Sequence, residues 1–412
     1  MYKLNCNFYY HYFGHDMVVI NSDRRYLLNE YQAFIVSQIN ETGSIDSIVD
    51  YFAQVTDEDR HKVEELLDSA LVLLLKTGFV VPSNKREKVP IYGESGKYYP
   101  KKITIELTNK CHLQCVHCFK EASPVNRDHL TSSDLIRFLD EIKDKVYSIQ
   151  LTGGEPMAHP HFKKIIEYVL DNFSDVSMTT TGHLINSKNI EYIKRLSYVQ
   201  VSLYHYNPEQ NDSITNGKDT LLKTLRGIKF LNESGVDYSV TNIVRKNLID
   251  EFDDFIDYLI YNQVKSIRFG LFSHLGRGKS VGSEWFLNAK EIEKFYDMLI
   301  EKSKDYKNQI NIHTWESDTC SSFFEDTTGE VMKCGAGIIE WTINEYGELK
   351  PCPFFPDNDF LGYSIENYQE YASLNNESSI ISKINDWESL LRTVGLSTKN
   401  VCEEIYRVVE NK

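Results

Sequence analysis

The sequence "CHLQCVHC" crowds three cysteines, Cys111, Cys115 and Cys118, into eight residues. Thiolates are ligands for soft metals and for iron–sulfur clusters. A structural zinc site takes four ligands, usually from two close pairs, whereas three cysteines on a cubane cluster leave one iron open for another ligand. The C-x3-C-x2-C spacing therefore favours an iron–sulfur cluster, and a zinc site completed by His112 and His117 is the alternative.

An alternation of strand and helix patterns between residues 96 and 305 must position these thiols. The strand candidates are ITIEL, YSIQLT, VSMTT, VQVSLY, YSVTNIV and SIRFGLF. Helix-length segments lie between or after them, at 132–145, 160–173, 218–234, 249–263 and 288–304. Six such repeats predict a parallel sheet with right-handed crossovers, either a barrel or an open curved sheet. Chemistry in these folds lies at the carboxyl ends of strands, and Cys111 directly follows the first strand.

Four segments in this order resemble the radical S-adenosylmethionine (SAM) superfamily: LTNKCHLQCVHC, LTGGEP, TTG and VSLY, at the ends of the first four strands. The resemblance covers residues 100–280 and implies an α/β fold with a partial (β/α)6 TIM-like barrel. It implies that Cys111, Cys115 and Cys118 hold a 4Fe–4S cluster whose fourth iron chelates SAM. One electron then cleaves SAM to a 5′-deoxyadenosyl radical, which abstracts hydrogen from the substrate. An electron donor such as flavodoxin or ferredoxin is an implied partner.

The resemblance also implies which residues contact SAM. Gly153, Gly154 and Glu155 match the motif that receives the methionine ammonium, and two glycines allow a ligand to approach the backbone closely. Ser202 matches a polar residue near the ribose and carboxylate. His117 matches the aromatic position that packs on adenine.

Two further contacts are expected from the same comparison. Phe269, in the sixth strand, is expected to approach the adenine. Thr180 and Thr181 precede Gly182 where the family often has Thr-Asn-Gly, so this chain departs from the pattern and the two threonines are candidate contacts in place of the asparagine.

The region 306–412 carries the remaining clustered cysteines. Cys334, Gly347 and Cys352 form a C-x12-G-x4-C pattern, which looks like the opening of the SPASM and Twitch domains that add auxiliary clusters to radical SAM enzymes. Cys320 fits an extra ligand seen in such domains. The dense cysteine run of a full SPASM domain is absent, and only Cys402 remains. One auxiliary iron–sulfur cluster is expected; incidental cysteines or a zinc knot are the alternatives.

Cys402 has two candidate roles. It lies in the first turn of an expected terminal helix in "TKNVCEEIYRVV". A thiol at a helix N-terminus has a lowered pKa, which suits a thiolate ligand. We therefore expect ligation, which would fill every position of the auxiliary cluster. If Cys402 is not a ligand, one iron is open for a substrate cysteine, and Cys402 becomes a candidate catalytic hydrogen donor.

Residues 1–90 read as a small α+β, winged-helix-like unit followed by a linker. "MVVIN" and "YLLN" are strand-like, and residues 29–40 and 58–78 read as helices. The second helix carries an apolar stripe and a C-terminal glycine: Val63, Leu66, Leu67, Ala70, Leu71, Leu74 and Gly78. The unit resembles the peptide-recognition element of ribosomal-peptide maturation, which binds a leader peptide as an added strand. A domain that only packs is the alternative.

Composition limits the partners. The chain of 412 residues has 41% apolar and 25% charged residues and a net charge of −15, which argues against nucleic-acid binding. Its start lacks a signal peptide, and its longest aliphatic run, Ala70–Leu75, is too short to span a bilayer. We expect a cytoplasmic protein that binds no membrane.

Together these patterns predict a radical SAM maturase of a ribosomally made precursor peptide. Thioether cross-linking is the first choice among its reactions, ahead of epimerisation and carbon–carbon cross-linking. The alternatives are a Twitch-type dehydrogenase of small molecules and, without catalysis, a zinc-bearing peptide-binding protein.

Overall fold

A computed structural model describes residues 1–412 except 22–24, 273, 314–336, 338–339, 355–361 and 374–412. Its amino-terminal part holds two small sheets, in the orders β4-β3-β2-β6 and β1-β5, and three helices. The strands are β1 (Tyr2–Leu4), β2 (Tyr9–Phe13), β3 (Asp16–Ile20), β4 (Arg25–Leu28), β5 (Val80–Pro82) and β6 (Ile91–Tyr92), and the helices are α1 (Glu30–Thr42), α2 (Ile45–Thr56) and α3 (Arg60–Lys76).

Helix α3 confirms the predicted stripe with one exception. Val63, Leu67, Ala70, Leu71 and Leu74 are buried in the core of the unit. Leu66, predicted in the stripe, is 59% exposed, because the buried face of the helix is narrower than the predicted stripe. Gly78 follows the helix with φ +79°, the left-handed conformation typical of a helix end.

The segment that follows is not only a linker. Its residues Ile91 and Tyr92 form β6, which pairs in parallel with β2. Tyr92 also donates to or accepts from the Ser174 hydroxyl at 2.7 Å, and Tyr9 packs edge-on against Tyr147. Residues 91 and 92 thus belong to the amino-terminal sheet, and aromatic side chains of this part contact the central part of the chain.

The central sheet has nine strands in the described part of the chain, in the order β13-β12-β11-β10-β9-β8-β7-β14-β15. All pairs are parallel except β14 with β15. The strands are β7 (Lys102–Glu106), β8 (Ser148–Thr152), β9 (Asp175–Thr180), β10 (Tyr198–Ser202), β11 (Tyr238–Ile243), β12 (Ser266–Gly270), β13 (Asn311–His313), β14 (Glu340–Ile343) and β15 (Leu349–Lys350).

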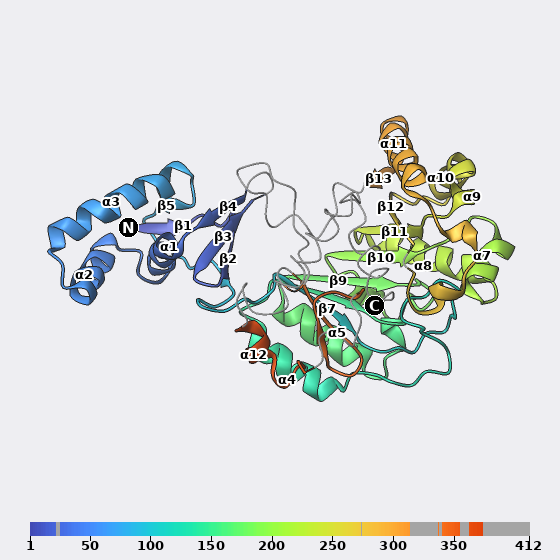
Figure 1. Ribbon diagram of the computed structural model, residues 1–412, viewed down its shortest axis with the longest axis horizontal. Coiled ribbons are helices and arrows are strands. Elements are labelled where there is room, and N and C mark those ends of the chain that lie inside the picture. Colours follow the sequence, from blue (N-terminus) through green and yellow to red (C-terminus); the bar gives the residue numbers. More distant parts are fainter. Residues whose placement is uncertain (22–24, 273, 314–336, 338–339, 355–361, 374–412) are drawn as a thin grey trace.

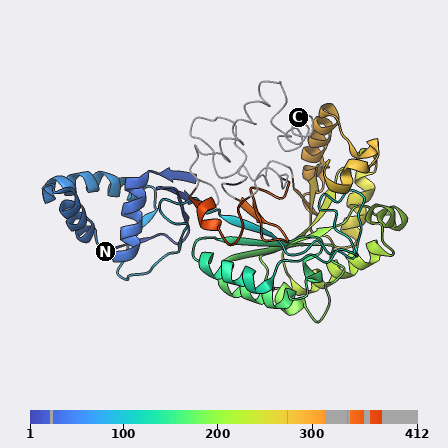
Figure 2. The same cartoon turned by 60° about the horizontal axis from the view of Figure 1, so that its bottom comes forward.

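Helices cover the outer face of this curved sheet (Figures 1 and 2). They are α4 (Ser132–Ile142), α5 (Phe162–Asn172), α6 (Ile190–Ile193), α7 (Pro208–Thr215), α8 (Thr220–Ser234), α9 (Lys246–Asp250), α10 (Phe252–Tyr261), α11 (Ala289–Asp305) and α12 (Tyr368–Ala372). The six predicted strands and five predicted helices are all present. None of the helices described is long and apolar enough to cross a membrane.

The sheet is wider than six repeats predict. Strand β13 pairs with β12 at one side, and β14 pairs with β7 at the other, although both lie in the region 306–412, for which the cysteine pattern predicts a separate extension. Strands β14 and β15 form an antiparallel hairpin. The central sheet therefore includes strands from beyond residue 305.

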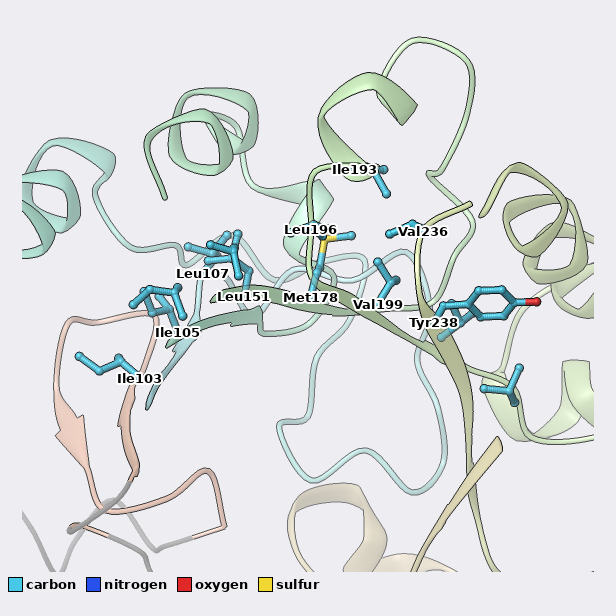
Figure 3. Close-up of a cluster of buried hydrophobic side chains, with 14 of the residues drawn as sticks. Ile103, Ile105, Leu107, Leu151, Met178, Ile193, Leu196, Val199, Val236 and Tyr238 are labelled. Carbon is cyan, nitrogen blue, oxygen red and sulfur yellow. The ribbon is translucent and has the colours of Figure 1, made fainter. Parts of the chain in front are cut away.

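The two faces of the sheet differ in polarity because side chains alternate along a strand. Ile103, Ile105 and Leu107 lie beside Leu151 and Met178 in the helix-covered core (Figure 3). The opposite face is polar, and hydrogen bonds run across it from strand to strand. Thr104 donates to Gln150 at 3.3 Å, Gln150 to Thr179 at 3.0 Å, and Thr179 to Gln200 at 3.0 Å. This alternation leaves a hydrophilic concave face.

A buried histidine joins the amino-terminal unit to the central part and predicts a pH dependence. His11 of β2 is 1% exposed; its Nε2 lies 2.9 Å from the Tyr99 carbonyl and its Nδ1 2.7 Å from the Tyr9 hydroxyl. Burial lowers the pKa of His11 to about 4. The stabilisation by neutral His11 is therefore complete above its unfolded pKa of about 6.5 and is lost as the pH falls towards 4.

Between about pH 7.5 and pH 5, the wild type should therefore lose about 2 kcal/mol more unfolding free energy than His11→Gln, which cannot titrate there. Urea unfolding of both proteins at the two pH values measures the difference. Equal losses would show that His11 titrates normally in the folded protein.

Candidate active site

The loop after β7 places the three thiols together at the carboxyl end of the sheet. Cys111 is buried, and Cys115 and Cys118 pack partly buried against the same small apolar cluster with Leu113 and Ala122. Burial raises the pKa of the Cys111 thiol to about 12 and raises that of Cys115 further above its ordinary value. Such thiols keep their protons until a bound metal centre supplies compensating positive charge.

The donor set fits an iron–sulfur cluster better than a single ion. Within the residues that the structure describes, no three His, Cys, Asp or Glu side chains form a group that could hold a metal ion. Each cysteine on a cubane cluster binds a different iron, so its thiolates do not converge on one point. The zinc alternative also needs His112 and His117, and the His112 Nε2 lies within hydrogen-bond distance of His183 and Thr181.

A distant segment clamps the cysteine loop. The guanidinium of Arg277 donates from Nε to the Cys115 carbonyl at 2.9 Å and from Nη2 to the Ala122 carbonyl at 2.6 Å. Its backbone N–H donates to the Cys118 carbonyl at 3.1 Å. Gly276 has φ +51°, and a Cβ there would lie 2.3 Å from the Phe119 carbonyl oxygen, so glycine is required. Nothing in the local sequence around Cys118 predicted this clamp.

The glycines of "GGEP" let the end of β8 touch the cysteine loop. A Cβ on Gly153 would lie 2.5 Å from the Thr108 oxygen, and one on Gly154 would lie 2.5 Å from the Lys110 oxygen. The Gly154 N–H donates to the Thr108 carbonyl at 2.6 Å, and the Glu155 N–H donates to the Lys110 carbonyl at 3.0 Å. Glycine is needed at 153 and 154 because two backbones meet without side chains between them.

Glu155 is fully buried, and its carboxylate holds the end of β9. It accepts hydrogen bonds from the Thr180 hydroxyl at 2.8 Å, the Thr181 hydroxyl at 2.8 Å and the Thr181 N–H at 2.9 Å. The Met157 N–H donates at 3.3 Å. Hydrogen bonds of this number satisfy a buried carboxylate. Thr180 and Thr181 thus donate hydrogen bonds to the Glu155 carboxylate.

Two histidines extend this network. His112 Nε2 lies 2.9 Å from His183 Nδ1 and 3.2 Å from the Thr181 hydroxyl, and His183 Nε2 lies 3.1 Å from the Thr224 hydroxyl. Burial lowers the pKa of His112, and it lowers that of His183 to about 4, so both rings are neutral near pH 7. Sequence reasoning missed His183 and Thr224, since neither lies in a motif.

The predicted adenine contacts lie in different surroundings. His117 is stacked on Trp285 with ring centroids 4.9 Å apart and meets Tyr204 edge-on at 4.4 Å. Burial lowers the pKa of His117 to about 3, so this ring is a neutral packing surface. Ser202 is the last residue of β10, half-buried at the same end of the sheet.

Phe269 requires a correction. It packs against Phe252 of α10 and Phe295 of α11, at centroid distances of 5.4 and 5.7 Å, inside the helix-covered core. Side chains alternate along β12, and position 269 falls on the apolar face of the strand, so this residue does not serve as the expected adenine contact.

Only one of the C-terminal cysteines lies among the described residues. Cys352 follows β15, is partly buried and packs against the main core. Cys320, Cys334 and Cys402 lie outside the residues that the structure describes.

Comparisons with known proteins agree with this geometry. Residues 105–259 match the family model of the Radical SAM superfamily. The chain is 25% identical over 375 residues to the antilisterial bacteriocin subtilosin biosynthesis protein AlbA of Bacillus subtilis, which covers 89% of this chain and 80% of AlbA. It is 24% identical over 307 residues to the mycofactocin maturase MftC of Mycolicibacterium smegmatis, covering 72% and 75% of the two chains.

A solved structure shares the fold. The crystal structure of Streptococcus suis SuiB bound to its precursor peptide SuiA superposes with a TM-score of 0.62, at 15% identity, over 92% of this chain and 91% of SuiB. A likeness at this identity supports the α/β architecture, including its amino-terminal part, and no more than that.

The close approach of Gly154 to the cysteine loop predicts the effect of one methyl group. Gly154→Ala should strain the Lys110 backbone by about 1–3 kcal/mol, as overpacking does, and reduce the iron bound per chain after anaerobic reconstitution. Gly270→Ala, at the end of β12, is the control, because the nearest atom is the flexible Ile243 Cδ1 at 3.3 Å. Full iron loading of Gly154→Ala would show that the loop tolerates displacement.

Proposed function

Because the chain carries a radical SAM domain at residues 105–259 and is therefore an enzyme, we propose that it matures a ribosomally made precursor peptide. The observation that carries this proposal is the three-thiol loop at the carboxyl end of a parallel sheet, in a chain that also has a small amino-terminal unit. Two proteins similar to this chain are named as a subtilosin biosynthesis protein and a mycofactocin maturase. SuiB, of similar fold, was crystallised with its precursor peptide.

We propose that Cys111, Cys115 and Cys118 hold a 4Fe–4S cluster and that Gly153, Gly154, Ser202 and His117 line the SAM site beside it. The cluster supplies the electron that cleaves bound SAM, from an external donor such as flavodoxin or ferredoxin. The chain's own residues position these groups: Glu155 fixes Thr180 and Thr181, and Arg277 fixes the backbone around Cys115. The stacked rings of His117 and Trp285 exclude water from this side.

The amino-terminal sheet has an edge suited to a leader peptide. Strand β4 lies at the end of the order β4-β3-β2-β6, and within the described residues it pairs only with β3. Leu27 on this strand is 61% exposed. An open edge strand with an exposed apolar side chain is a template for an added strand, so we propose that the leader peptide pairs with β4.

The choice of reaction rests on the C-terminal cysteines. We propose that Cys352 binds one auxiliary iron–sulfur cluster together with Cys320, Cys334 and Cys402, and that the peptide product is a thioether. If Cys402 is instead a hydrogen donor, the product is an epimerised residue. Carbon–carbon cross-linking is the third candidate reaction.

The first test concerns the cluster. Cys115→Ala should abolish the formation of 5′-deoxyadenosine from SAM by the reduced, anaerobically reconstituted enzyme, because the cluster loses one of three protein ligands. Cys6→Ala, at an exposed free cysteine, is the control and should retain the activity. Undiminished SAM cleavage by Cys115→Ala would exclude radical SAM chemistry at this loop.

The second test concerns the leader peptide. Leu27→Lys should weaken binding of a leader-bearing peptide encoded beside the gene by roughly tenfold, the loss expected when one buried apolar contact is removed. Val55→Lys is a matched control, because Val55 is 64% exposed but lies on α2, away from the sheet edge. Equal affinities of Leu27→Lys and the wild type, measured by fluorescence anisotropy, would contradict binding at β4.

A further inference from the structure

A cavity of about 630 Å³ borders the thiol loop at Val116 and is also lined by Trp285, the ring on which His117 is stacked. It opens between α7, the start of α9 and the segment 277–285. Val116, Ile214 and Trp285 give it an apolar wall. Gln210, Ser213 and Asn247 form an exposed polar rim. A volume of this size holds a side chain or a small ligand.

Arg245 lines this cavity as a buried cation. Its side chain is 8% exposed, its Nη2 donates to the Tyr204 carbonyl at 2.7 Å, and its guanidinium carbon lies 5.4 Å from the Trp285 ring. Its Nε is buried and has no hydrogen-bond partner among the described residues. The guanidinium therefore keeps an unsatisfied donor in a residue that lines the cavity.

No carboxylate in the described part of the chain forms an ion pair with Arg245. Glu251 and Glu284 favour its charge from a distance, but the Glu251 carboxylate lies 3.1 Å from His205 Nε2, and Glu284 is exposed at the cavity rim. The neighbouring Arg277 adds a second positive charge, with its guanidinium held by two carbonyls. A buried cation without a counterion is costly, so this site is incomplete without an anion.

The chemistry of the anion follows from the donors. A guanidinium presents parallel N–H groups that match a carboxylate. The chain as a whole carries a charge of −15, so an acidic group is attracted only where positive charge is concentrated. The apolar wall beside Arg245 suits the methylene groups of an aspartate or glutamate side chain.

We propose that this cavity binds an acidic side chain of the peptide substrate and thereby registers the peptide beside the cluster loop. The proposal rests on the proposed function for its peptide, and it adds a substrate class: a peptide with an aspartate or glutamate that occupies the Arg245 cavity. Val116, in the cavity wall, immediately precedes His117, so a peptide anchored there lies next to the loop that carries Cys115 and Cys118.

The test compares two probe peptides on the reconstituted full-length enzyme, saturated with S-adenosylhomocysteine. Acetyl-Gly-Glu-Gly-amide should bind about tenfold or more tightly than acetyl-Gly-Gln-Gly-amide, as expected for a charge-assisted hydrogen bond. Ligand-observed nuclear magnetic resonance measures both affinities. Equal affinities for the two peptides overturn the proposal, and this comparison needs no variant to fold.

Variants locate the site. Arg245→Gln should remove the preference for the glutamate peptide, and Arg245→Lys should restore part of it, because lysine keeps the charge without the fork. Lys246→Gln is the matched control: it removes one positive charge at the next residue, which forms a partly exposed ion pair with Glu291 and does not line the cavity. A preference that survives in Arg245→Gln, or is lost in Lys246→Gln, overturns the assignment to the cavity.

Two further outcomes separate this inference from others. If the glutamate preference appears only when S-adenosylhomocysteine is left out, the cavity binds the carboxylate of the cofactor and the proposal is wrong. If the glutamate preference is present and depends on Arg245, the anion site stands even when no peptide is modified, and only the maturase function fails. If a peptide is modified but the preference is absent, the maturase function stands and this inference alone fails.

Discussion

The site depends on a contact between two backbones with no side chains between them. Gly153 and Gly154 end β8 against residues 108–110, and the Gly154 and Glu155 N–H groups donate to that segment. Any Cβ at these two glycines would overlap a carbonyl oxygen, so the strand end and the cysteine loop fix one another's position. The thiol of Cys111 is placed by this contact, since residues 108–110 lead directly into it.

The contact is possible because the polar groups around it are paired. Glu155 is fully buried, and three hydrogen bonds from Thr180 and Thr181 compensate for the lost hydration of its carboxylate. On the other side of the loop, Lys120 is held between Glu106 at 2.7 Å and Glu345. Burial opposes the charge of Lys120, but the two carboxylates raise its pKa above the ordinary value. The loop is thus bonded on one flank to β8 and β9 and on the other to β7 and the β14–β15 hairpin.

The sequence predicted those features that depend on short-range patterns. Alternating residues such as Ile103 and Ile105 predicted β7, and the strand-end glycines marked the site, because both signals lie within a few residues. Strand β14 was not predicted as part of the sheet, since its partner β7 is more than 200 residues away and its four residues carry little pattern. His183 was missed for the same reason: its hydrogen-bond partners, His112 and Thr224, are brought to it only by the fold.

Two segments that are distant in the sequence hold the two halves of the cysteine loop. The glycine contacts hold its amino-terminal half from inside the sheet end, whereas Gly276 and Arg277 hold its carboxyl-terminal half through the carbonyls of Cys115 and Cys118. Arg277 uses two of its guanidinium nitrogens for this clamp, whereas the described residues give the Arg245 guanidinium one hydrogen bond, to the Tyr204 carbonyl. Both arginines line the adjoining cavity, so the arginine that holds the loop also contributes to the positive charge of that cavity.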